Sequence, residues 1–287
     1  MTPLSARNRL IAPIMRTSKG TGLGARHALN PDWLVPCWPA PARVQAVCST
    51  RAGGQSRSPY HALNLGDHVG DDPVDVAANR ATLRQAMDAQ PVFLNQVHGT
   101  SAVWLSDRSA HGTSADACLT AQPHVACTIM VADCLPVLLT NEQGSLVAAA
   151  HAGWRGLAGV DGRDILETVL ASFRSAADSD SAFDASKMLA WLGPCIGPQA
   201  FEVGDEVRDR LTAQDLAART LFRPKTPGKW LADLQGLARL RLAALGVTQV
   251  YGNDGTSPWC TVSQPSRFFS HRRDRVSGRM AACIWLE

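Results

Sequence analysis

Three side chains that bind zinc in many proteins stand at the ends of short apolar runs. Cys134 follows the run 126–131, His151 ends the run 146–150, and His98 follows the run 92–94 through a polar loop. A polar side chain at the edge of a buried strand usually has a specific role. Two histidines and one cysteine give zinc three protein ligands and leave its fourth position open, which is typical of a catalytic site.

The spacing of these residues matches no short metal-binding motif, so the residues alone leave other interpretations open. Cys134 could be the thiolate nucleophile of a cysteine hydrolase, with His151 or His98 as its base. A plain structural interpretation makes Cys134 a buried thiol and both histidines satisfied core residues. A protein that uses zinc only structurally would need a fourth ligand, which Cys195 or His271 could supply.

Arginines beside turns are candidates for binding an anion. Arg51 precedes the glycine pair at 53–54, and the tail segment 267–274 carries His271 and Arg272 after two aromatic residues. Glycines let a backbone approach a ligand closely, and a guanidinium can hold an anion with two hydrogen bonds. The alternatives are a plain tight turn at residues 53–54 and a solvated basic turn in the tail.

Apolar periodicity predicts the elements that must position these side chains. A turn at residues 141–144 favours a hairpin of strands 135–139 and 146–150. Residues 213–230 have no such pattern and are predicted to be a loop. Further strands are expected at residues 44–48, 102–105, 126–131, 188–192, 247–251 and 280–286, and helices at residues 74–87, 165–173, 205–211 and 234–245.

Composition excludes several classes of protein. The chain has 287 residues, 45% of them hydrophobic, and a net charge of +3, which is too small to favour nucleic-acid binding. No apolar run reaches the about 18 residues that a membrane span needs. Eight cysteines without a CxxC pair fit free thiols in a reducing compartment, so we expect a cytoplasmic protein.

The first part of the chain differs in composition from the rest. Residues 1–31 contain five Lys or Arg and no acid. A disordered basic leader is favoured over a targeting peptide, because its apolar patch is short and broken by Pro13. We therefore expect a leader over residues 1–31 and one catalytic domain over residues 32–287.

Taken together, several motifs in order resemble the YfiH family, also called the multicopper polyphenol oxidase or laccase-domain family. The resemblance covers residues 33–287. It departs from the family pattern at residue 277, where Ser-Gly-Arg replaces Thr-Gly-Arg. The motifs are residues 95–99 (Asn-Gln-Val-His-Gly), 132–136 (Ala-Asp-Cys-Leu-Pro), 151–156 (His-Ala-Gly-Trp-Arg-Gly), 193–197 with 201–204, and 269–273 (Phe-Ser-His-Arg-Arg).

This resemblance implies a single α+β domain with mixed β-sheets layered between helices, and a zinc site at His98, Cys134 and His151. It implies phosphorolysis of adenosine, inosine, guanosine and methylthioadenosine, with adenosine deamination as a second activity, for which zinc would activate water. Relatives are also linked to peptidoglycan editing, so the alternative function is a cysteine-type amidase using Cys134. Copper is possible in the family, but zinc is favoured here. Laccase chemistry is not expected, because only three of the eight histidines fall in the motifs.

We assign roles to further residues under this hypothesis. Asp133 is a candidate proton shuttle or a residue that orients Cys134. Arg51, Arg155 and Arg272 are the guanidiniums available for phosphate. The expected partners are a purine nucleoside and phosphate, without nucleic acid or membrane. The catalytic set is Cys134, Asp133 and Arg51, and the substrate-binding set is Asn64, Gln96, Arg155, His271 and Arg272.

Overall fold

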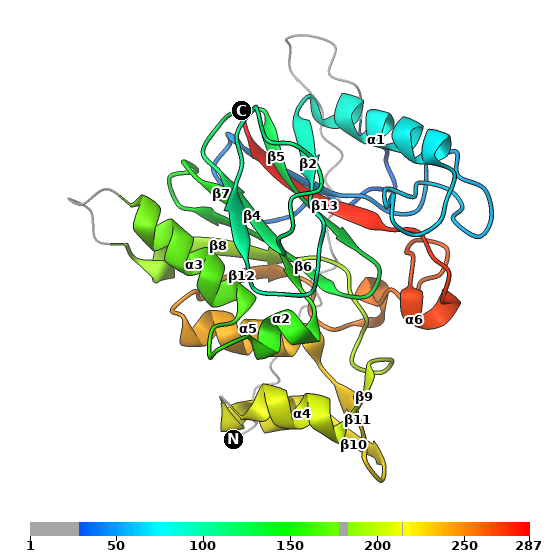
Figure 1. Cartoon of the computed structure of the whole chain (residues 1–287). Helices are drawn as coiled ribbons and strands as arrows, with labels where there is room; N and C mark the ends of the chain where they lie inside the picture. Colours follow the sequence, from blue (N-terminus) through cyan, green and yellow to red (C-terminus); the bar gives the residue numbers. More distant parts are fainter. Residues whose placement is uncertain (1–28, 178–182, 214) are drawn as a thin grey trace, which may run out of the picture.

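Two β-sheets stack face to face between helices, which gives four layers (Figure 1). This computed structural model describes residues 29–177, 183–213 and 215–287. Helix α1 (Pro73–Met87) covers the outer face of the first sheet, and helices α3 (Ile165–Ala176) and α5 (Leu234–Ala244) cover the second (Figure 1). The predicted α+β class is confirmed. All of the predicted leader except residues 29–31 lies outside the described residues.

The first sheet has four strands in the order β1-β13-β5-β2. Every residue of its central strand β13 is buried, because the two faces of that strand meet different cores. Ile284 and the other even-numbered residues pack between the sheets, whereas Trp285 and the other odd-numbered residues pack toward α1. This double burial explains why an unbroken apolar run marks the strand. The strands are β1 (Val44–Cys48), β2 (Gln90–Phe93), β5 (Val125–Val131) and β13 (Met280–Leu286).

The second sheet has six strands in the order β12-β8-β6-β7-β4-β3. Its centre is the predicted hairpin, which is confirmed: β6 and β7 pair antiparallel, with Pro136 opposite His151. Gly144 closes the turn with φ 62°, a conformation that favours glycine. The strands are β3 (Ala102–Trp104), β4 (Ala117–Thr120), β6 (Leu135–Asn141), β7 (Val147–Ala152), β8 (Met188–Leu192) and β12 (Gln249–Gly252).

The prediction that residues 213–230 form a loop is wrong. Much of this segment forms two strands of a small third sheet, in the order β10-β11-β9. Four of the five β10 residues are exposed, so the strand lacks the buried alternation that would reveal it in sequence. The elements here are β9 (Glu202–Gly204), the 3₁₀ turn Leu216–Leu221, β10 (Phe222–Thr226) and β11 (Lys229–Ala232).

Helix starts follow local capping chemistry. Asp72 accepts a hydrogen bond from the Val74 N–H at 2.8 Å, and Pro73 occupies the first turn of α1. Asp164 caps α3 in the same way through the Glu167 N–H.

Among the described helices, none combines the length and apolarity that a bilayer crossing requires. The shorter helices are α2 (Trp154–Ala158), α4 (Asp205–Thr212) and α6 (His271–Asp274).

One buried side chain ties α1 to the loop that follows β1. The Asn79 amide donates to Ser56 Oγ at 2.9 Å and to the carbonyl oxygens of Ala62 and Asn64 at 3.2 and 2.9 Å. Its oxygen accepts from the Gln55 N–H at 3.0 Å. Asn79 therefore satisfies loop polar groups that are closed off from water.

We expect Asn79→Ala to lower the free energy of unfolding by about 2–3 kcal/mol, because it leaves several buried polar groups without partners. Urea denaturation measures this change. Gln85→Ala, at an exposed position of the same helix, should change stability by less than about 0.5 kcal/mol. Equal losses in the two variants would contradict the role given to Asn79.

Candidate metal centre

His98, Cys134 and His151 lie together, with their ligand atoms all within 4.8 Å of one another. Cys134 directly precedes β6 and His151 lies near the end of β7, so the hairpin register places them side by side. His98 comes from the loop after β2, and its ring centroid is 4.8 Å from that of His151. Within residues 29–177, 183–213 and 215–287, no fourth His, Cys, Asp or Glu joins this group.

Two backbone features allow the Cys134 sulfur to reach the group. Asp133 adopts φ 99°, which turns the chain sharply at the start of β6. Gly153 leaves room on the other side: a Cβ at this position would lie 3.0 Å from Cys134 Sγ and 3.5 Å from His98 Cδ2. Any larger residue at position 153 would therefore displace the sulfur or the imidazole.

A buried carboxylate, Asp116, fixes both histidines. One oxygen accepts from His151 Nδ1 at 2.8 Å and from the His98 backbone N–H at 2.9 Å. The other accepts from the N–H groups of Gly99 and Val97 at 2.7 and 3.2 Å. Burial alone would raise the pKa of Asp116, but the hydrogen bonds from His151 and the loop hold it below its usual value.

Because an ionised carboxylate only accepts hydrogen bonds, Asp116 places a proton on Nδ1 of His151 and leaves Nε2 for the group. The sequence analysis missed this residue. A single acid between two alanines, at the start of an apolar run that becomes β4, is the signal that could have revealed it. Such an acid is buried only where several donors meet it.

The thiol and imidazole perturb each other strongly. Burial alone would raise the pKa of Cys134, but the charge and hydrogen bond of His151, and then those of His98, lower it to about 6. Burial alone would lower the pKa of His151, but the Cys134 thiolate and the Asp116 carboxylate raise it to about 9. Without a metal, the pair is therefore a thiolate and an imidazolium at neutral pH.

The three side chains together can hold a metal ion. A thiolate and two imidazoles are ligands that suit zinc and other borderline metals. The same thiolate and imidazolium, with Asp116 behind the imidazole, also resemble the nucleophile, base and orienting acid of a cysteine hydrolase.

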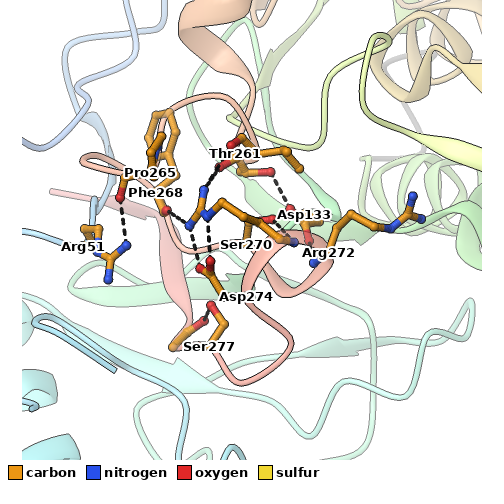
Figure 2. Close-up of polar contacts among 12 residues, drawn as sticks. Arg51, Asp133, Thr261, Pro265, Phe268, Ser270, Arg272, Asp274 and Ser277 are labelled. Carbon is orange, nitrogen blue, oxygen red and sulfur yellow. Dashed lines mark hydrogen bonds and ion pairs between the residues drawn. The ribbon is translucent and has the colours of Figure 1, made fainter. Parts of the chain in front are cut away.

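Asp133 fastens the chain tail to the start of β6 (Figure 2). One carboxylate oxygen accepts from Thr261 Oγ1 at 2.5 Å, and the other accepts from the Arg272 backbone N–H at 2.6 Å. The Arg272 guanidinium points away from Asp133 (Figure 2) and donates to the Glu202 carbonyl oxygen at 3.0 Å. One Asp133 oxygen thus holds the Thr261 side chain, and the other holds the backbone at Arg272.

Arg51 and Arg155, also predicted to bind an anion, contact other groups of the protein. The Arg51 guanidinium donates to the carbonyl oxygens of His61 and Pro265 at 2.6–2.8 Å (Figure 2 shows the Pro265 contact). Arg155 is exposed and lies over the Trp154 ring, 4.4 Å from its centroid. His271 is exposed at the start of α6.

The two predicted amide contacts are used inside the protein. Gln96 exchanges two 2.8 Å hydrogen bonds with the backbone of Met130, which joins the His98 loop to β5. Asn64 accepts from the N–H groups of Gly66 and Arg279 at 2.9 and 2.8 Å. Its amide donates to the Gly66 carbonyl and to Asp71. Both side chains therefore bind backbone groups of other segments: Gln96 binds β5, and Asn64 binds the residue before β13.

The chain is similar to known proteins over most of its length. The family model described as "Multi-copper polyphenol oxidoreductase laccase" matches residues 45–287. Purine nucleoside phosphorylase PA4543 of Pseudomonas aeruginosa is 47% identical over 256 residues, covering 89% of this chain and 98% of the relative. Purine nucleoside phosphorylase YfiH of Escherichia coli is 46% identical over 255 residues, covering 88% and 98%. The crystal structure of Neisseria meningitidis protein NMB0706 is 44% identical with a TM-score of 0.81, covering 89% of this chain and 99% of that one.

We expect Asp116→Asn to weaken zinc binding by about 10–100-fold, because an amide nitrogen would face the loop N–H groups or His151 Nδ1. Competition with a chromophoric chelator measures the zinc dissociation constant. Asp107→Asn, in an exposed loop, is the matched control and should bind zinc like the wild type. An unchanged constant in Asp116→Asn would show that the carboxylate does not orient the site.

In metal-free protein, the Cys134 thiolate should form as the pH rises through about 6, because its pKa is lowered to about 6 by His151. Alkylation of Cys134 by iodoacetamide should therefore have a midpoint near that pH, which mass spectrometry of the labelled peptide can follow. Glutathione in the same sample provides the ordinary thiol, with a midpoint of about 8.5 or above. In His151→Gln the midpoint should move upward, and a midpoint that stays in place would contradict the coupling.

Proposed function

Because the chain belongs to the YfiH family, the multi-copper polyphenol oxidoreductase laccase family of its matched model, we propose that it is a zinc-dependent purine nucleoside phosphorylase. The observation that carries this proposal is the three-ligand group of His98, Cys134 and His151 with Asp116 behind it. The names of the relatives supply the substrate class. Its substrates would be adenosine, inosine, guanosine and methylthioadenosine with phosphate, and adenosine deamination would be a second activity.

The donor set fits zinc. One thiolate and two imidazoles would hold the ion. Asp116 keeps the His151 proton on Nδ1, which leaves Nε2 for the ion. Zinc bound here supplies Lewis acidity near the substrate. The glycine at position 153 and the turn at Asp133 keep the thiolate within reach of both imidazoles.

Laccase chemistry does not follow from the family description. A four-copper centre needs many imidazole ligands, and the chain has eight histidines. In the part of the chain that the structure describes, only His98, Cys134 and His151 form a group of three or more ligands. One mononuclear site accounts for these residues.

One observation favours a second candidate function, a cysteine-type amidase that edits a peptidoglycan precursor. Cys134, His151 and Asp116 are ordered as nucleophile, base and orienting acid, and the pKa of Cys134 is lowered to about 6. His98 distinguishes the two functions, because a metal uses both imidazoles whereas a hydrolase of this kind needs one.

All eight cysteines are free thiols, which supports our placement of the protein in the cytoplasm.

We expect purified, zinc-loaded protein to release hypoxanthine from inosine only when phosphate is present. Cys134→Ala should lose zinc and base release together, because the thiolate is the charged ligand of the set. Chromatography of the released base and metal analysis of the protein measure the two effects. Cys37→Ala, at an exposed thiol, is the matched control and should keep both.

Two results would overturn this function. A Cys134→Ala protein that retains one zinc ion per chain would mean that the ligand set is wrong. Folded, zinc-loaded wild type that releases no base from any of the four nucleosides would exclude phosphorolysis. Amide cleavage of a serine-containing cell-wall precursor would then be the activity to measure, with His98→Ala expected to remain partly active.

A further inference from the structure

Arg279 directly precedes β13 and has a guanidinium whose hydrogen bonds are only partly used. Its Nη1 donates to the carbonyl oxygens of Ser277 and Gly278 at 2.8 and 3.1 Å. Among the described residues, none accepts a hydrogen bond from its Nε or Nη2, and no carboxylate forms an ion pair with it. A half-buried guanidinium keeps its charge, so its free donors favour an anion from outside the protein.

This guanidinium lies beside the metal cluster. Burial lowers the pKa of Arg279, whereas the nearby Cys134 and Asp133, and then Tyr60, raise it. The sheet register places it there: Met280 lies opposite Val131 in the antiparallel pair of β13 and β5, so Arg279 is next to the segment that leads from β5 to Asp133 and Cys134. Arg51 and Arg155, by contrast, lie against backbone carbonyls and a tryptophan ring. Arg279 therefore has the place and the free donors that the sequence analysis gave to other arginines.

The loop 64–66 holds Arg279 in position from both sides of its backbone. Asn64 Oδ1 accepts from the Arg279 N–H at 2.8 Å, and the Leu65 N–H donates to the Arg279 carbonyl at 3.1 Å. Gly66 lies under the side chain: a Cβ there would come within 2.8 Å of Arg279 Cγ and 3.4 Å of His68 Cε1. The absence of a side chain at position 66 lets the arginine and the imidazole approach each other.

Asp67 and His68 follow Gly66, the residue that lies under the Arg279 side chain. Burial lowers the pKa of His68, and the neighbouring Arg279 lowers it further. Asp67 is the acid in this group, and it already contacts Arg80 Nη2 at 3.1 Å and His68 Nδ1 at 3.5 Å. The Asp67 carboxylate is thus already paired with Arg80 and His68.

Space for a ligand adjoins these groups. A hollow of about 300 Å³ has His68, Asp67 and Arg80 in its wall, together with Asn95 from the start of the His98 loop. This volume suffices for a small polar ligand. His68 borders the hollow, and Gly66 lies against both His68 and Arg279, so the arginine is close to one side of the hollow.

We infer that Arg279, supported by His68, is the oxyanion-binding residue of the site and that its ligand is inorganic phosphate. The inference rests on the proposed phosphorylase function. A guanidinium fork matches two phosphate oxygens, and each charge-assisted hydrogen bond is stronger than a neutral one. Asn64 and Gly66 are positioning residues, because they act on phosphate only through Arg279.

The reaction assigns a clear task to this residue. A phosphate oxygen forms a bond to C1′ of the ribose while the bond from C1′ to N9 of the purine breaks. The electron pair of the broken bond leaves with the purine, and the proton of hydrogen phosphate passes to the base. Arg279 holds the non-attacking oxygens and so fixes the distance and direction of attack.

Steady-state kinetics of inosine phosphorolysis by the zinc-loaded protein tests this inference. We expect Arg279→Gln to raise the KM for phosphate by about 10–100-fold, because charge-assisted hydrogen bonds are lost. Arg279→Lys should raise it less, since it keeps the charge and loses the fork. The KM for inosine and the zinc content should stay within about twofold of wild type. Arg84→Gln, at an exposed position of α1, is the matched control.

Gly66→Ala provides a test that keeps the arginine. The added Cβ would displace the Arg279 side chain, so the KM for phosphate should rise although every charged group remains. This variant and Arg279→Lys decide the question if Arg279→Gln fails to fold, which thermal melting would reveal. An unchanged KM for phosphate in the folded variants would overturn the inference and leave the phosphorylase function intact.

A wild type without phosphorolysis would instead refute the proposed function, and direct binding then tests the site. Calorimetric titration of inorganic phosphate into zinc-loaded wild type and Arg279→Gln gives that answer. Binding to the wild type that weakens at least about tenfold in the variant would support the oxyanion site. Equal binding to both proteins, or no binding to the wild type, would overturn it.

Discussion

The buried carboxylate of Asp116 is the constraint on which the arrangement of the site depends. Four hydrogen bonds reach its two oxygens, one from His151 Nδ1 and three from successive N–H groups of the loop 97–99. The Asp116 carbonyl oxygen also accepts from the His151 N–H at 2.7 Å. A charge can be buried at little net cost only when it is paired so fully. His98 has φ 60°, and these same amide contacts hold it in that uncommon conformation.

The cluster joins the two stacked sheets. His98 follows β2 of the first sheet, whereas Cys134 and His151 flank the central hairpin of the second. Gln96 links the same loop to β5, and Asp133 fastens the tail segment beside the hairpin. Polar side chains thus hold the loop of His98 and the start of β6 in place on both sides of the cluster, which suits a site that must keep a fixed geometry.

Sequence patterns predicted the elements of the fold better than the contacts of the site. β13 was predicted to the residue because all of its side chains are buried and apolar, and the hairpin because a turn separates two such runs. Strand β10 was missed because its side chains are mostly exposed. Which side chains meet was harder to predict, because contacts such as Asn64 with Arg279 depend on strand order in the first sheet. Asn64 and Gln96 were predicted to bind substrate and Arg51 to act in catalysis. In the structure, all three side chains bind backbone groups.

The place of β13 in the first sheet has a consequence for biosynthesis. It is the last described strand in chain order, yet it lies between β1 and β5, which a ribosome makes much earlier. A nascent chain therefore carries two unpaired strand edges until residues 280–286 emerge, and such edges are prone to wrong pairing. Arg279 arrives with the same strand. The ligands of the metal cluster are synthesised well before the guanidinium beside them, so the two halves of this region are completed at different times during translation.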